Sequence, residues 1–384
     1  MLHPKINRLD YGKLLMPPEG YKLTRAITTT YSLDIEALML MPIALFYSES
    51  IDREKGELRF DMLDSIIKAT DKITVYCQEG KIKVPKKYHF LMAFWEQRIK
   101  QVRMPIAEAS FHPKIWVIRF DADGEPAYYK FIITSKNLTF SFDYDIVFST
   151  EGTVNFDQKK DLNTSVIDFL NYLNNIDNSI DNKFIEDLKK VKFNIPPKFS
   201  NLDFFPIGIN DANNKPYTNP IGEYEWSDLL AISPFVDETT VKKLRTITKN
   251  NLWICGLRNE LSMLSESVKS EVELFQFSEQ IESNSMLQDF TEGDDDPLPQ
   301  SLHAKAYFTN FDGVPYWYLG SANFTSPAFG RNVEFLIELE CEASGLTPKT
   351  VLKQLTEQDN KNNIPIFETF VQLEDDTAAE RKKF

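Results

Sequence analysis

The sequence predicts an α/β protein of two lobes, each a mixed sheet flanked by helices, related by a pseudo-two-fold axis. Three observations predict this architecture. A His-x-Lys triplet at 112–114 precedes a Ser-x-Asn triplet at 135–137, and both recur at 303–305 and 321–323. Each copy lies on a hairpin pattern, and a strand–helix–strand order precedes each hairpin. A chain of 384 residues is long enough for two lobes.

The first half of the chain alternates β-branched and aromatic runs with turn and cap signals. A helix start is expected where Ser32 can cap and Glu36 lies in the first turn. Aromatic and β-branched runs flank an Asp-Ala-Asp-Gly turn, which indicates a hairpin. The expected elements are a strand at 26–31, a helix start at 32–36, a strand at 72–77, and a hairpin with arms at 111–120 and 128–134.

The second half repeats this order after a segment at 161–190 that is periodic enough for bridging helices and a loop at 201–220 rich in Asn, Asp and Pro. The expected elements are a strand at 229–232, a helix at 237–248, a strand at 251–255, and a hairpin with arms at 302–309 and 314–319. The predicted units are a first lobe with bridging helices at 1–195, a second lobe at 196–345 and a polar tail at 346–384.

The repeated triplets contain the residue types that phosphodiester cleavage requires. Side chains alternate between the two faces of a strand, so the His and Lys of one triplet share a face. A neutral imidazole can attack phosphorus, and a protonated one can supply a proton to the leaving oxygen. Lysine and asparagine can hold the non-bridging oxygens. A single His-x-Lys pair is usually a solvated strand edge, so the ordered repeat is what favours catalysis.

The repeat resembles the signature of the phospholipase D superfamily, which has two His-x-Lys motifs, each followed by a Gly/Ser-rich segment with Asn. The second copy fits closely, with Gly320 before Ser321 and an Asn-Val-Glu segment at 332–334. The first copy is looser. It has Thr134 in place of Gly320, and an Asp-Tyr-Asp segment at 143–145 in place of 332–334.

The family's Asp, five residues after the Lys, is absent from both copies. Arg119 and Asn310 stand there instead. That Asp is also missing from the tyrosyl-DNA phosphodiesterase branch of the superfamily, so its absence weakens the lipase interpretation more than the phosphodiesterase interpretation.

The resemblance implies a phosphodiesterase that works through a phosphohistidine intermediate. It makes His112 the nucleophile and His303 the general acid, with the swapped assignment as the alternative. Glu334, or else Asp143 or Asp145, would orient an imidazole. The candidate catalytic residues are His112, Lys114, Asn137, His303, Lys305, Asn323 and Glu334, and the candidate substrate-binding residues are Ser135 and Ser321.

Composition indicates a globular protein without a metal site or a cofactor. Hydrophobic residues make up 42% and charged residues 26% of the chain. The 3 cysteines and 4 histidines are scattered, so we predict no disulfide framework and no zinc cluster. Residues 1–10 lack the apolar region of a signal peptide, and the apolar run 38–46 is too short to span a bilayer. We therefore expect a cytoplasmic protein that does not bind a membrane.

The net charge of −14 opposes binding of a polyanion unless cations are concentrated locally. Basic stretches at 81–87 and 189–198 are either solvated surface or a substrate groove. The acidic run at 291–296, just before His303, is either a solvated loop or a segment that repels substrate.

Three functions remain open. The first is a nuclease or related phosphodiesterase that acts on DNA or RNA. The second is a lipid phospholipase D or transphosphatidylase, and the third is a catalytically retired binding or scaffold protein. The segments at 9–12 and 31–34 look like the opening of phospholipase D-like proteins of bacterial defence loci. That resemblance implies an antiviral or restriction nuclease whose partner is a helicase or another defence-system subunit.

Overall fold

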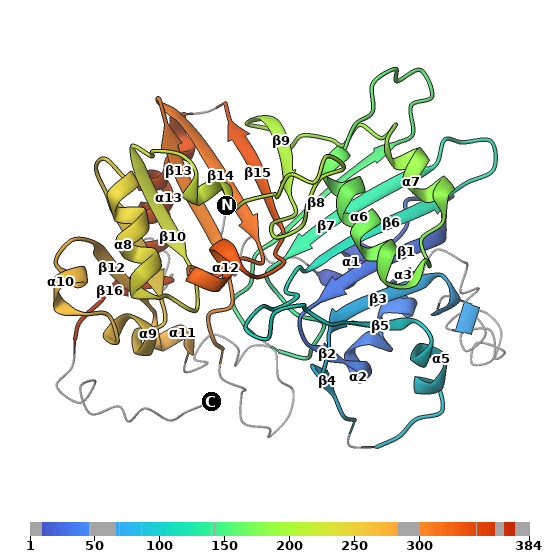
Figure 1. Cartoon of the computed structure of the whole chain (residues 1–384), viewed down its shortest axis with the longest axis horizontal. Helices are drawn as coiled ribbons and strands as arrows, with labels where there is room; N and C mark the ends of the chain where they lie inside the picture. The colour runs from blue at the N-terminus through green and yellow to red at the C-terminus, as the bar shows by residue number, and fades with distance from the viewer. Residues whose placement is uncertain are drawn as a thin grey trace.

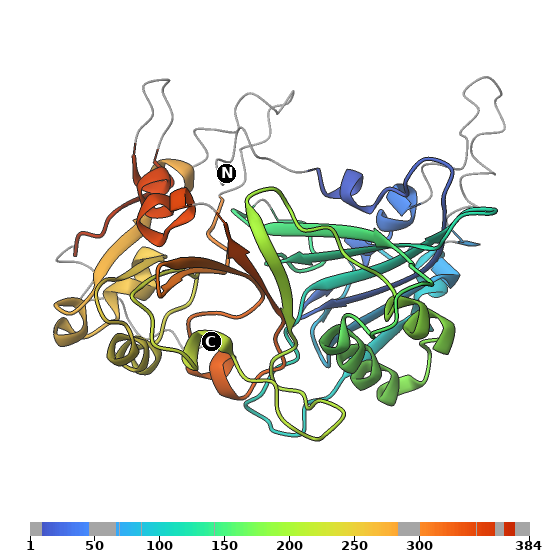
Figure 2. The ribbon, with the colours of Figure 1, turned by 90° about the horizontal axis from the view of Figure 1, so that it is seen from above.

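Two lobes lie side by side, one built by each half of the chain (Figure 1). Each lobe contains one mixed sheet with helices on both faces, as the view from above shows (Figure 2). The structure is a computed structural model that describes residues 10–45, 67–68, 70–85, 87–141, 143–282, 300–342, 344–357 and 365–372.

The sheet of the first lobe combines parallel and antiparallel pairs. In spatial order the sheet contains β5 (Ile99–Val102), β3 (Ile73–Gln78), β1 (Lys22–Thr30), β6 (Ile115–Asp121), β7 (Tyr128–Thr134) and β8 (Val147–Thr153). The pairs β5–β3 and β3–β1 are parallel, and the pairs β1–β6, β6–β7 and β7–β8 are antiparallel. A short parallel pair, β2 (Leu33–Asp34) with β4 (Ile82–Lys83), forms a separate two-stranded sheet.

The sheet of the second lobe repeats this order, with an additional strand at each edge. In spatial order it contains β16 (Phe367–Thr369), β12 (Glu273–Phe277), β11 (Leu252–Gly256), β10 (Asp228–Ile232), β13 (Ala306–Phe311), β14 (Val314–Gly320), β15 (Leu336–Cys341) and β9 (Phe199–Phe205). The pairs β10–β11 and β11–β12 are parallel, and the pairs β10–β13, β13–β14 and β14–β15 are antiparallel. The predicted mixed sheets and their pseudo-two-fold relation are confirmed.

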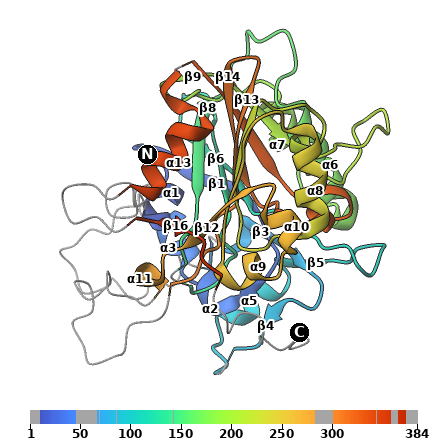
Figure 3. The same cartoon turned by 90° about the vertical axis from the view of Figure 1, so that its left-hand side faces the viewer.

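Helices lie on both faces of each sheet (Figure 2 and Figure 3). The helices of the described residues are α1 (Tyr11–Leu15), α2 (Ile35–Leu38), α3 (Met41–Leu45), α5 (Met92–Glu96), α6 (Thr164–Asp177), α7 (Asn182–Leu188), α8 (Glu238–Ile247), α9 (Arg258–Ser262), α10 (Glu266–Lys269), α11 (Glu279–Glu282), α12 (Ser326–Gly330) and α13 (Pro348–Thr356), with 3-10 turns η1 (Pro220–Gly222) and η2 (Ser344–Leu346). In the first lobe α6 and α7 lie on one face, and α1 and α3 lie on the other (Figure 2). In the second lobe α8 and α13 lie on opposite sides of the strands (Figure 3).

One aromatic core joins the two lobes. The ring of Phe131 on β7 lies 4.8 Å from Phe204 on β9 and 5.6 Å from Phe335 of the second lobe, measured between centroids. Phe169 of the bridging helix α6 packs edge-on against the same Phe335 at 5.1 Å. Aromatic pairs in this range contribute packing energy beyond their buried area. The lobes therefore form one body, which fixes the site between them.

The departure of the first copy at Thr134 has a packing explanation. A Cβ on Gly320 would lie 2.1 Å from the carbonyl oxygen of Phe335 and 2.9 Å from Cδ1 of Ile133, across the lobe junction. Gly320 also has φ +156°. Glycine is therefore required at this position of the second copy, whereas threonine fits the equivalent position of the first.

Two segments differ from the sequence-based expectations. The segment 201–220 is not loop throughout, because β9 occupies 199–205 and Phe199 packs against Trp317 of β14 at 5.5 Å. The helix expected from Ser32 is the single turn α2, and its cap is Asp34, which accepts a bond from the Glu36 amide.

The described residues of the predicted tail belong to the second lobe. Helix α13 packs against β10 and β13, and β16 pairs with β12 at the edge of the sheet. The rest of that tail and the acidic run 291–296 lie outside the described residues. The division at 195/196 stays a prediction.

Candidate active site

Each His-x-Lys triplet lies immediately before its hairpin, at the junction of the two lobes. The residue before each histidine makes a parallel bridge to the opposite lobe: Phe111 pairs with Val333, and Leu302 pairs with Tyr144. The amide of His112 donates to the Val333 carbonyl at 2.8 Å, and the amide of His303 donates to the Tyr144 carbonyl at 3.0 Å. These two backbone bridges between the lobes bring the two halves of the site together.

A carboxylate from the opposite lobe holds each imidazole. Nδ1 of His112 lies 2.8 Å from Oε2 of Glu334, and Nδ1 of His303 lies 3.1 Å from Oδ1 of Asp145. A carboxylate accepts hydrogen bonds, so each Nδ1 carries a proton and donates. Nε2 is then the nitrogen of each ring that can act as a base, a nucleophile or, when protonated, an acid. Glu334 is fully buried, whereas Asp145 is 14% exposed.

The serines of the repeated motif hold these carboxylates. Ser321 donates to Glu334 and accepts from the Phe335 amide at 2.9 Å. Ser135 makes the same bonds in the first lobe, donating to Asp145 at 2.9 Å and accepting from the amide of residue 146 at 2.9 Å. Both hydroxyl groups are buried and engaged by protein atoms. Substrate binding by Ser135 and Ser321 stays a prediction, and the described bonds give them a positioning role.

The two lysines are buried in the same cluster. Nζ of Lys114 donates to the His112 carbonyl at 2.9 Å and lies 3.0 Å from Nε2 of His112. Nζ of Lys305 donates to the His303 carbonyl at 2.6 Å. Burial lowers the pKa of Lys305 to about 8, and burial together with the charge of Lys305 holds the pKa of Lys114 well below its usual value. An anion placed between them would stabilise their charged forms.

Burial also determines the protonation of the histidines. It lowers the pKa of His112 to about 4, because Glu334 offsets only part of the desolvation and Lys114 adds to it. The pKa of His303 is lowered in the same direction by burial and by Lys305. Both imidazoles are therefore mainly neutral at pH 7. Burial alone would raise the pKa of the Glu334 carboxyl. The attraction of the His112 imidazolium and the hydrogen bond between the two side chains outweigh burial and lower that pKa below its usual value.

The two asparagines share an uncommon property. The side-chain oxygens of Asn137 and Asn323 are buried and have no hydrogen-bond partner among the described residues. Buried polar atoms without partners are rare in folded proteins and need an explanation, such as a catalytic role or a bound species. The unpaired atom is an acceptor at equivalent positions of both lobes, so it would take a donor group, whereas the Nδ2 donors of these amides are the atoms that could contact phosphate oxygens.

Sequence reasoning weighed Asp145 but placed only Glu334 among the candidate catalytic residues. The signal that identifies Asp145 is its place in the first copy, which is equivalent to that of Glu334 in the second. Asp143 makes no described hydrogen bond to an imidazole, and its charge acts on Lys305.

The two residues in place of the family's Asp have structural roles. Arg119 pairs with Asp121 and with Asp187 of α7, and the Asn310 side chain accepts from the Gly313 amide in a turn. Both therefore stabilise their own lobe rather than the site.

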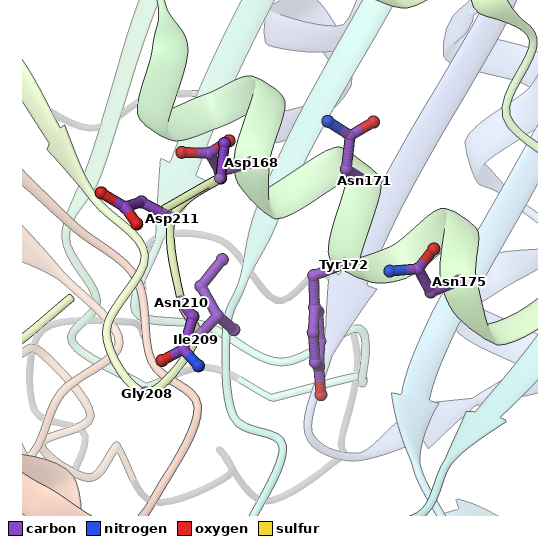
Figure 4. A pocket seen from close by; sticks show the side chains of 9 residues that line it. Asp168, Asn171, Tyr172, Asn175, Gly208, Ile209, Asn210 and Asp211 are labelled. Carbon is purple, nitrogen blue, oxygen red and sulfur yellow. The ribbon is translucent and has the colours of Figure 1, made fainter. Parts of the chain in front are cut away.

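A cavity of about 430 Å³ lies between α6 and the loop 208–212 (Figure 4). Its lining includes the carboxylates of Asp168 and Asp211, the amides of Asn171 and Asn175, and no Lys or Arg. This lining would repel an anionic ligand, whereas the histidine cluster contains the two buried lysines Lys114 and Lys305.

The described ranges contain neither a metal-binding cluster nor a membrane-spanning helix. There, no group of three His, Cys, Asp or Glu side chains is arranged to bind a metal ion. The helices of these ranges are too short or too polar to cross a bilayer.

No family model and no curated protein sequence matches the chain. Similar solved structures include histidine variants of the yeast tyrosyl-DNA phosphodiesterase. One is 14% identical and covers 88% of this chain and 87% of that chain with a TM-score of 0.51. Another is 12% identical and covers 87% of each chain, also with a TM-score of 0.51. The likeness extends over nearly the whole of both chains, and it confirms the predicted fold of two phospholipase D-like lobes.

Each histidine is held by a carboxylate of the other lobe, so a substitution of that carboxylate should change the pKa of the histidine across the junction. Asp145→Asn should lower the pKa of His303 further, because Asp145 favours the charged imidazole, and Glu334→Gln should do the same to His112. NMR titration of the ring signals can follow each of the 4 histidines, with exposed His89 as the internal control. If Glu334→Gln shifted His303 and left His112 unchanged, the described pairing would be wrong.

Proposed function

We propose that the chain is a metal-independent phosphodiesterase that cleaves DNA or RNA through a phosphohistidine intermediate. The observation that carries the proposal is the convergence of two His–Lys pairs, each with a carboxylate from the opposite lobe. The structurally similar yeast enzyme is, by its name, a tyrosyl-DNA phosphodiesterase. The Asp145 carboxylate of the first copy, although that copy fits the motif less closely, holds His303 as Glu334 of the second copy holds His112, and this argues against a catalytically retired site.

The reaction divides between the two imidazoles. Neutral His112 attacks phosphorus through Nε2 while the bond to the leaving oxygen breaks, and His303, in its doubly protonated imidazolium form, transfers its Nε2 proton to that oxygen. His303 then takes a proton from water, whose oxygen attacks phosphorus and returns the electron pair to His112. Lys114 and Lys305 hold the non-bridging oxygens, and the amides of Asn137 and Asn323 stabilise the developing charge. The swapped assignment of the histidines remains the alternative.

Lys114 must move for this attack. Its Nζ lies 3.0 Å from Nε2 of His112, where it competes for the lone pair that attacks phosphorus. A phosphate oxygen is a charged and therefore stronger acceptor for an ammonium group. Substrate binding would draw Lys114 away and free the nucleophile.

The lipid alternative has one observation in its favour. The segment 84–94 exposes apolar side chains on the first lobe, among them Val84 at 83% and Tyr88 at 74%. Such a surface could contact a membrane. The helicase or other defence-system partner rests on the resemblance of the opening segments alone. A cytoplasmic location is supported by the three free thiols of Cys77, Cys255 and Cys341.

Substrate class and metal requirement can be tested together. The purified chain should cleave single-stranded DNA or RNA at low salt with excess chelator present, because its own lysines and histidines supply the charge. Phosphatidylcholine vesicles serve as the competing substrate, and His112→Ala serves as the inactive control. Cleavage that disappears with chelator and returns with magnesium would overturn the mechanism, and cleavage of vesicles alone would select the lipid alternative.

The dependence of kcat/KM on pH should be bell-shaped, with its maximum below pH 7. His112 must be neutral, so activity is lost as the pH falls through its pKa of about 4. His303 must be protonated, and its pKa lies below 6.5, so activity is lost as the pH rises through that lowered value. The profile should be recorded with a p-nitrophenyl phosphodiester. The alkaline limb should weaken in His303→Ala, because this leaving group needs little protonation, and a maximum above neutral pH would contradict the assignment.

A further inference from the structure

We propose that Lys81, held on the ring of Tyr31, binds the phosphate next to the scissile one in a polymeric substrate. This inference rests on the proposed function and specifies its substrate class as a single-stranded polynucleotide. A diester with one phosphate has its charge at Lys114 and Lys305 and none left for Lys81. A polynucleotide has further phosphates on either side.

A chain of two ring contacts connects Lys81 to the proposed nucleophile. The half-buried ring of Tyr31 meets the His112 ring edge-on, with 5.1 Å between the centroids. Nζ of Lys81 lies 5.5 Å from the centroid of the Tyr31 ring. The face of an aromatic ring attracts a cation, so Tyr31 holds the ammonium group at the edge of the site.

The backbone fixes Lys81 relative to His112. The Lys81 amide donates to the Gln78 carbonyl at 3.2 Å, and the Lys81 carbonyl accepts from the Leu33 amide at 3.0 Å. The side chain of Gln78 in turn accepts from the amide of Phe111, the residue before His112, at 2.7 Å. Lys81 is therefore tied to the segment that carries the nucleophile.

The charge of Lys81 is available to a ligand. Its neighbour Lys83 is paired with Asp34 at 2.7 Å. Lys81 is exposed, and no carboxylate of the described chain lies within ion-pair distance of it. In a protein with a net charge of −14, an exposed lysine on the far side of the Tyr31 ring from the proposed nucleophile offers the local attraction that a polyanion needs.

The test compares Lys81→Ala on two substrates, a single-stranded oligonucleotide and bis(p-nitrophenyl) phosphate. The loss of kcat/KM should be about tenfold larger on the oligonucleotide, and the slope of its log kcat/KM against log salt should fall by about one. Lys159→Ala is the matched control, since Lys159 is exposed in the same lobe and makes no described bond. It should change neither substrate.

The outcomes separate this inference from the function on which it rests. Equal losses on both substrates, or an unchanged salt slope, would overturn the role of Lys81. If the wild type cleaves the small diester and vesicles but no oligonucleotide, the polynucleotide class is wrong. If it cleaves none of them, the proposed function itself fails.

A second, independent observation assigns Thr30 and Ser233 as positioning residues for the two asparagines. Thr30 ends β1, and Ser233 directly follows β10. Each hydroxyl donates to the carbonyl two residues later, at 2.8 Å for Thr30 and 2.7 Å for Ser233. Each accepts, at 3.0 Å, the amide of the residue after the asparagine, Leu138 or Phe324.

The same bonds occur in both lobes with different side chains. Both hydroxyl groups are fully buried. A second backbone bond clamps each loop, from the amide of Asp34 to the Leu138 carbonyl at 2.8 Å and from that of Asp237 to the Phe324 carbonyl at 3.1 Å. Thr and Ser share the hydroxyl and differ in shape, so the hydrogen bond is the common requirement. It fixes the backbone on which the asparagine amide is carried.

A double-mutant cycle tests this assignment. Thr30→Val should lower kcat by about tenfold, Thr30→Ser should retain most of it, and Thr30→Val should add little in an Asn137→Ala background because the residue to be positioned is gone. If Thr30→Val does not fold, Ser233→Ala with Asn323→Ala provides the same cycle, with Ser233→Thr as the conservative variant. Additive losses, or equal losses for Val and Ser, would overturn the role.

Discussion

The site depends on the crossing of the two lobes, in which each histidine is held by a carboxylate of the other half. Two lysines and two imidazoles lie buried together, and desolvation alone would destabilise their charged forms. Glu334 and Asp145 offset part of that cost only when the lobes are docked. The buried aromatic core around Phe131 and Phe335 packs the two lobes together and contributes to docking. Stability of the junction and assembly of the site are therefore one requirement.

Duplication of one motif does not make its two copies chemically equal. His112 is 12% exposed and pairs with a fully buried carboxylate, whereas His303 is 23% exposed and its Asp145 partner is partly solvated. The serine contacts are the same in both lobes, so the difference lies in burial and in the length of the acid. A two-step displacement needs one base and one acid from a single residue type. Unequal environments are how proteins separate such roles.

The sequence predicted the repeat and the mixed sheets, and it paired each histidine with the lysine beside which the structure places it, because these follow from local periodicity and motif spacing. It could not assign a carboxylate to each histidine, since the partners lie 222 and 158 residues apart and meet only through the crossing. Strand β9 was missed because its Asn and Asp side chains resemble a loop, while Phe204 packs against Phe131 across the lobe junction. The contact between the rings of Tyr31 and His112 likewise could not be predicted from the spacing of residues in the sequence.

A strongly acidic chain can still bind an anionic substrate, because net charge and local field are separate quantities. At about 0.1 M salt, exposed charges more than about 10 Å apart are largely screened from one another, so carboxylates far from the site act on it weakly. Lys114 and Lys305 are screened much less, because they are buried. Their lowered pKa values mean that an arriving phosphate favours proton uptake as well as ion pairing. Part of the substrate's binding energy would thus charge the lysines, and the free site would avoid the full cost of burying two cations side by side.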